Sequence, residues 1–183
     1  MKKKIYLILL FIIPFLSFGQ FSESLKEMKL DKNADFKKYQ SLVFDASNFI
    51  LKNPVDVKSK EFISATRIME FWMNKETGMR IPTFGNFFSS LTNKNKQQFL
   101  YTVVMMNYVL DQKINHQRIL RCEKIKGQKY KEQEDVREVQ IEGAKILLKY
   151  IGNRKNHVPM NSNTRRYWKA YKKNQLNEIF FKK

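Results

Sequence analysis

The sequence predicts an all-α protein, a single irregular bundle of five to seven helices that follows an N-terminal signal peptide. Three observations carry this prediction. Apolar residues recur at three- and four-residue steps, strand-like alternation is nowhere sustained, and only six Gly and four Pro interrupt 183 residues. A short array of stacked helical hairpins is the alternative. The chain shows no repeat of fixed period, so the bundle is preferred.

The first 19 residues have the pattern of an export signal. Three lysines at 2–4 precede an apolar run at 5–18, and small side chains at Ser17 and Gly19 place the cleavage before Gln20. The apolar run is shorter than the roughly 20 residues that a membrane-spanning helix needs. We therefore expect an exported protein, periplasmic or secreted. Its mature chain would have 164 residues and a net charge of +15, without a transmembrane span.

After a polar linker at 20–35, a helical domain is expected at 36–183. Its first helix, 36–52, has Asp35 as N-cap and an inward stripe of six apolar residues. The second, 58–77, has a similar stripe and ends before Gly78, which suits a left-handed position. The third, 94–112, begins after Asn93. It is apolar nearly all round, so it should be the central buried helix.

Two further helices complete the domain. We expect the central helix to break near Asn115, because an extension to Gly127 would give about 33 residues, long for a small globule. The helix at 129–151 ends before Gly152, and Gly143 inside it indicates a close helix–helix contact, since glycine costs about 1 kcal/mol there against alanine. The last helix, 164–180, has a cap at Asn163 or Thr164.

The composition excludes several classes of site. The lone Cys122 rules out a disulfide scaffold, and two histidines rule out most zinc architectures. Asp31, Asn33 and Asp35 begin like a calcium loop, but the glycine and the glutamate that such a loop needs later are missing. Nucleophile-elbow and phosphate-loop patterns do not occur. We therefore expect neither a metal nor a cofactor.

A small exported hydrolase remains an alternative, because two carboxylates, or a carboxylate and an imidazole, can transfer protons. The candidates are Glu70, Asp111 and His116. Glu70 lies between Met69 and Phe71, where desolvation can raise the pKa of its carboxyl group. It can equally face solvent or pair with a neighbouring cation. The hydrolase hypothesis requires one concave pocket that brings two of these side chains together.

The segment 77–85 joins two helices through two glycines and a proline. Loops on rigid helices often carry binding residues. Arg80 is the binding candidate here, because a guanidinium can hold an anionic group or cap a helix end. A self-packed connection, with Ile81 and Phe84 in the core, is the competing interpretation.

Cations and aromatic residues are interleaved near the C-terminus. Residues 164–183 contain seven cations and one acid, and a helical projection separates the aromatic side from most of the cations. A basic amphipathic helix of this kind can bind an anionic membrane surface or a groove of a partner. A docked aromatic side below a solvated cationic face is the simpler reading. The binding candidates are Arg165, Arg166, Trp168, Lys169, Lys172 and Lys173.

Together these features predict an exported, non-enzymatic helical protein that binds a macromolecular partner or an anionic surface of the cell envelope. Nucleic acid is a poor candidate partner, because an exported protein rarely meets it. The alternatives are the hydrolase and a structural subunit of an envelope assembly. The subunit should expose a contiguous apolar patch.

Overall fold

The computed structural model describes residues 19–32, 35–94 and 96–181. Residues 1–18 of the leader expected at 1–19, and Lys182 and Lys183, lie outside the described residues. Within the described part, every regular element is a helix, and the helices pack against one another, which confirms the all-α bundle. The α-helices there are α2 (Gln20–Leu30), α3 (Gln40–Lys52), α4 (Lys60–Met73), α5 (Gly85–Ser90), α6 (Gln97–Asn115), α7 (Glu134–Gly152), α8 (Ser162–Lys172) and α9 (Leu176–Phe180).

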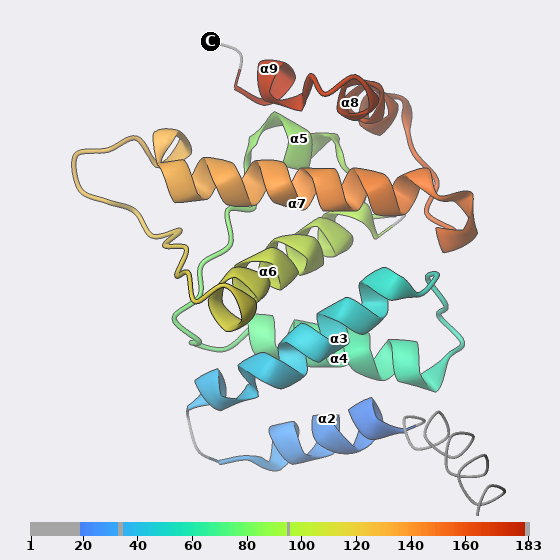
Figure 1. The fold of residues 1–183 in the computed structure, drawn as a ribbon. Helices are drawn as coiled ribbons and strands as arrows, with labels where there is room; N and C mark the ends of the chain where they lie inside the picture. Colours follow the sequence, from blue (N-terminus) through green and yellow to red (C-terminus); the bar gives the residue numbers. More distant parts are fainter. Residues whose placement is uncertain (1–18, 33–34, 95, 182–183) are drawn as a thin grey trace, which may run out of the picture.

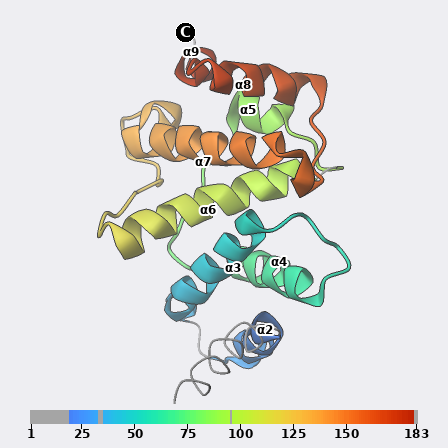
Figure 2. The same cartoon turned by 45° about the vertical axis from the view of Figure 1, so that its right-hand side comes forward.

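The helices form successive layers that follow the order of the chain, except that α5 lies beyond α7 (Figure 1). α2 packs on α4, the α3–α4 pair contacts α6 through α3, and α6 packs against α7. The layer beyond α7 holds α8 and α9, with α5 between α8 and the centre (Figure 2). The helices vary from five to 19 residues in length, so the layers are irregular.

The predicted central helix is confirmed, because α6 lies between α3 and α7 and is buried along most of its length. Gly143 lets α7 approach closely: a Cβ there would lie 2.6 Å from Cγ of Met105. Beside this contact, the buried hydroxyl of Tyr101 donates to the carbonyl oxygen of Gln140 at 2.7 Å. The close contact expected at Gly143 is therefore present.

The expected linker at 20–35 is largely helical, which corrects the sequence interpretation. α2 spans most of it, and Leu25 and Met28 are buried in the core. At the start of α2, the Glu61 carboxylate on α4 accepts the amide N–H groups of Gly19 and Phe21, at 3.2 and 3.0 Å. The segment has few apolar residues, and the two that are buried, Leu25 and Met28, lie three residues apart on one side of α2.

Several helix ends also differ from expectation. The helix expected at 58–77 ends at Met73, although Gly78 does adopt a left-handed conformation with φ of 72°. The helix expected at 164–180 is divided into α8 and α9, because Asn174 turns the chain with φ of 56°. Two details agree with the sequence. Asp35 caps the 3₁₀ helix Phe36–Tyr39 that leads into α3, and α6 ends at Asn115.

Candidate functional site

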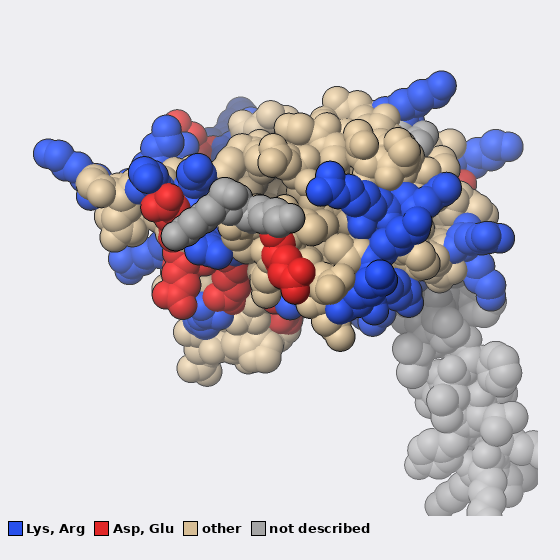
Figure 3. Space-filling model, turned by 90° about the horizontal axis from the view of Figure 1, so that it is seen from above, with Lys and Arg blue, Asp and Glu red and all other residues tan. Residues whose placement is uncertain are grey.

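Among the described residues, α8 carries a concentration of cations that no acid on the same helix opposes. Its cations recur at positions that cover about 120° of one side of a helix with 3.6 residues per turn. We call this surface the basic face of α8, and it consists of Arg165, Arg166, Lys169, Lys172 and the following Lys173. All five side chains are exposed, and residues 162–173 contain no acid. Seen from above α8 and α9, lysines and arginines gather on one side of the molecule, whereas acids and cations mix on the other (Figure 3).

α8 is held rigidly by its other side. Asn161 caps the helix, because its side chain accepts the amide of Thr164 at 2.7 Å. The ring of the buried Tyr167 packs edge-on against Phe87 of α5, with centroids 4.8 Å apart, and against Phe180 of α9. The sequence predicted this docking of the aromatic side. The cations are therefore presented to solvent by a fixed scaffold.

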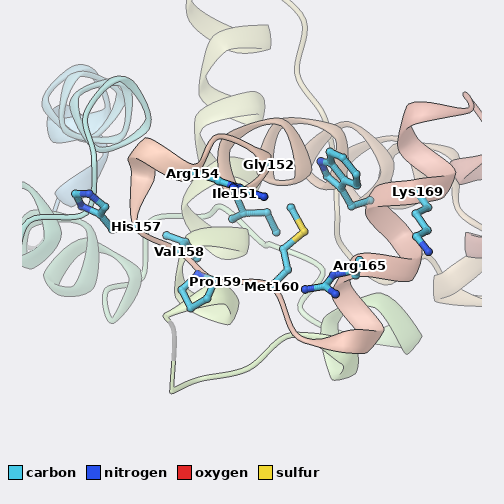
Figure 4. Close-up of a pocket in the computed structure, with 10 residues that line it drawn as sticks. Ile151, Gly152, Arg154, His157, Val158, Pro159, Met160, Arg165 and Lys169 are labelled. Atoms are coloured by element: carbon cyan, nitrogen blue, oxygen red, sulfur yellow. The ribbon is translucent and has the colours of Figure 1, made fainter.

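A cavity of about 660 Å³ opens beside this face, between the end of α7, the segment 153–161 and α8. We call it the basic cavity. Figure 4 shows the side chain of Arg165 extending from α8 toward Met160, with the Arg154 side chain reaching in above Ile151. Its lining residues are Ile151, Gly152, Arg154, His157, Val158, Pro159, Met160, Arg165, Trp168 and Lys169.

A buried hydrogen-bond network fixes the wall of this cavity. Gln97 of α6, fully buried, donates from Nε2 to the carbonyl oxygen of Pro159 at 2.7 Å. Its Oε1 accepts both the Thr164 hydroxyl and the Thr92 amide, each at 3.1 Å. Because one side chain joins three segments, the segment that carries Val158 and Met160 is fixed relative to α8.

The cavity is electrostatically one-sided. Arg154, Arg165 and Lys169 line it together with His157, and none of its lining residues is an acid. In the described part of the chain, neither guanidinium forms an ion pair or a side-chain hydrogen bond. The floor is apolar: Ile151 and Val158 are buried, and Trp168 is half-buried against Gly152. Such a cavity is complementary to an anion that also carries an apolar part.

The hydrolase candidates occupy other places. The half-buried Asp111 and the exposed His116 form a pair at the end of α6, with Oδ2 and Nε2 3.4 Å apart. Glu70 is exposed on α4, and none of the three residues lines the basic cavity. No cluster of three or more metal-binding side chains occurs among the described residues. The structure thus joins two of the three candidates, and on an open surface.

Arg80 is also separate from the basic cavity. The loop that carries it is fixed by Gln140 of α7, whose Nε2 donates to the carbonyl oxygens of Pro82 and Phe84 at 3.2 and 2.9 Å. Ile81 and Phe84 pack against the core, as the self-packed interpretation predicts. Arg80 is exposed and lines a second hollow with Cys122 and Glu123. An acid in this lining makes it less selective for anions than the basic cavity.

Sequence reasoning found Arg165, Trp168 and Lys169, which the structure places at one site. It missed Arg154, His157 and Met160, because the segment 153–161 has no helical periodicity. Comparison with protein-family models, curated proteins and solved structures found no match. Across the described residues, no helix is both long enough and apolar enough to cross a bilayer. The fold and the site define a helical protein with a preformed basic surface.

Proposed function

We propose that this is an exported, non-enzymatic helical protein that binds the anionic lipid surface of the cell envelope through the basic face of α8. The observation that carries the proposal is the array of five cations on one side of α8, without an acid, beside a cavity lined only by cations and apolar or uncharged groups. The export signal expected at residues 1–19 would bring the protein to the cell envelope.

The expected electrostatic free energy of binding supports an anionic lipid surface as the partner. Each lysine or arginine close to an anionic lipid surface contributes about 1 kcal/mol, so five of them give several kcal/mol at low ionic strength. Tyr167 already anchors α8 to the core, so binding requires no folding of the helix. Trp168 lies at the edge of the face, and an indole is suited to the boundary between headgroups and hydrocarbon. A peripheral mode of attachment follows from these features.

Vesicle sedimentation tests the proposal. The purified protein should bind vesicles of phosphatidylcholine with phosphatidylglycerol, and should bind pure phosphatidylcholine at least tenfold less. High salt should release it, because the interaction is screened. Changing Arg166, Lys169, Lys172 and Lys173 to Gln should abolish most of the binding.

The matched control removes the same charge elsewhere. Lys26, Lys29, Lys52 and Lys60 are exposed on α2, α3 and α4, and their change to Gln should leave most of the vesicle binding intact. Equal losses in the two variants would show that net charge alone is responsible and would overturn the proposal. Binding to an envelope protein that resists high salt, without vesicle binding, would favour a protein partner instead.

Export is tested independently. The full chain, expressed in its native host, should be recovered outside the cytoplasm with Gln20 as its first residue. Mass spectrometry of the purified product measures this directly. Recovery of an intact N-terminus in the cytoplasm would contradict the expected location.

A further inference from the structure

The basic cavity differs from the basic face in its shape and its floor. A flat cationic face needs no cavity, yet here two arginines from different elements, Arg154 and Arg165, face an apolar depression (Figure 4). His157 and Lys169 lie farther apart, at opposite ends of the group. The headgroup array of a membrane surface therefore does not account for this feature.

The lining restricts the chemistry of the occupant. An inorganic anion would satisfy the guanidinium groups but leave Ile151, Val158 and Trp168 without apolar contacts. A neutral hydrocarbon would cover the floor but would desolvate two unpaired cations, which is costly. A molecule with one anionic head and one hydrocarbon chain satisfies both, and about 660 Å³ is within the usual size range of small-molecule sites.

We infer that the basic cavity binds a single-chain anionic amphiphile, with a carboxylate or phosphate head between Arg154 and Arg165 and its chain against Trp168, Met160 and Val158. This inference rests on the proposed function, since Lys169 lines the cavity and also belongs to the basic face. The basic cavity would bind one molecule per chain, in addition to the lipid surface that the basic face binds. A fatty acid and a lysophospholipid or alkyl phosphate share the required chemistry.

Calorimetry and Trp168 fluorescence test the inference, with probes kept below their critical micelle concentrations. Dodecanoate and dodecyl phosphate distinguish the carboxylate from the phosphate head, and dodecanol and inorganic phosphate each lack one half of the ligand. We expect one anionic amphiphile per chain and at least tenfold weaker binding of both half-ligands. Trp72 is 1% exposed, so its emission should stay constant, and Trp168→Phe should remove the response.

Variants separate this inference from the proposed function. Arg154→Gln and Arg165→Gln should each weaken amphiphile binding at least tenfold. Arg166→Gln, which removes a cation of the basic face outside the cavity, should leave it unchanged. Circular dichroism confirms folding of each variant. Arg154→Gln should retain vesicle binding, because Arg154 is not part of the basic face.

Each failure has its own signature. Vesicle binding without amphiphile binding would overturn the cavity inference alone. Amphiphile binding without vesicle binding would overturn the proposed function and leave a soluble-ligand site. Equal affinity for dodecanol and dodecanoate, or for inorganic phosphate and dodecyl phosphate, would overturn the paired requirement for charge and chain.

Discussion

The indole of Trp168 lies directly against the backbone of Gly152, so closely that a Cβ added at Gly152 would overlap the indole Nε1 atom. The contact joins the last residue of α7 to α8 and forms one wall of the basic cavity. Nζ of Lys172, on the same helix as Trp168, lies 5.6 Å from the centroid of this ring. Trp168 therefore contacts a glycine of α7 and a cation of its own helix.

Gly152→Ala should move the indole of Trp168 away from α7. Overpacking typically costs about 1–3 kcal/mol, and the better helix propensity of alanine returns about 1 kcal/mol. The free energy of unfolding should therefore fall by about 2 kcal/mol or less, while the Trp168 emission changes clearly. Denaturation and fluorescence measure the two effects. Lys149→Ala, on the exposed side of α7, is the control, and an unchanged emission in Gly152→Ala would refute the contact.

Gly143→Ala should destabilise the bundle more than Gly152→Ala does. The new methyl group would lie 2.6 Å from Cγ of Met105, near the root of a fully buried side chain that has less room to move than the half-buried Trp168. Overpacking at this site should cost about 3 kcal/mol, the upper end of the usual range, and the better helix propensity of alanine returns about 1 kcal/mol, so we expect a net loss of about 2 kcal/mol in the free energy of unfolding. Urea titration measures it. A stability equal to or above that of the wild type would contradict the close α6–α7 contact.

Gln97→Leu should be strongly destabilising, because it removes three hydrogen bonds at once, those to the Pro159 carbonyl, the Thr92 amide and the Thr164 hydroxyl. The loss of these three hydrogen bonds should cost about 2–4 kcal/mol in total. The neighbouring Gln98→Ala is the control and should cost less than about 1 kcal/mol, since Gln98 is only half-buried and water can replace its bonds. Similar losses in the two variants would show that the buried network does not fix the cavity wall.

The thiol of Cys122 should give the protein a measurable sensitivity to alkaline pH. Burial raises the pKa of this thiol from 9.0 to about 12. The folded protein keeps the proton where the unfolded chain has lost it, so this contribution to stability is fully present below about pH 9. It declines as the pH rises from about 9 toward 12. Urea titrations across this range should show a smaller decline for Cys122→Ala, and an equal decline would contradict the raised pKa.

Glu138 should hold the loop 116–133 against proteolysis. Its carboxylate accepts two hydrogen bonds of 2.5 Å from Arg118 and one of 2.6 Å from the hydroxyl of Tyr108. Glu138→Gln removes the charge, so trypsin should cleave the lysine-rich loop several-fold faster. Glu142→Gln, which breaks a pair with Lys145 within α7, is the control. Equal cleavage rates in the two variants would show that this cluster does not restrain the loop.

Periodicity predicted the features that depend on local sequence. The buried helix at Phe99–Leu110 follows from apolar spacing, its end near Asn115 from the usual length of helices, and the close approach at Gly143 from a glycine inside a helix, and the structure contains each. α2 was missed because a helix with few apolar residues reads as polar until the groove that receives them is known. The turn at Asn174 was missed because the residues on both sides of it keep a helical pattern.

The residues of the site also divide into those that local sequence predicts and those that it does not. The cations of α8 share one side of a helix, which the sequence can show. Arg154 reaches that site only because Gln97 holds Pro159 from 62 residues away in the chain. Pairings between such distant segments depend on tertiary packing, and the residue spacing near Arg154 does not indicate them.

The two amide hydrogen bonds that Glu61 accepts at the start of α2 have a consequence for the removal of the leader. Gln20 lies between the two residues whose amides Glu61 accepts. If the leader is cut before Gln20, the new ammonium group is therefore created near a carboxylate that is already in position. The amide of Phe21 keeps its bond, and the lost amide partner is replaced by a full positive charge. The newly made end would then be fastened to α4 from its first residue, rather than left as a loose tail for exopeptidases.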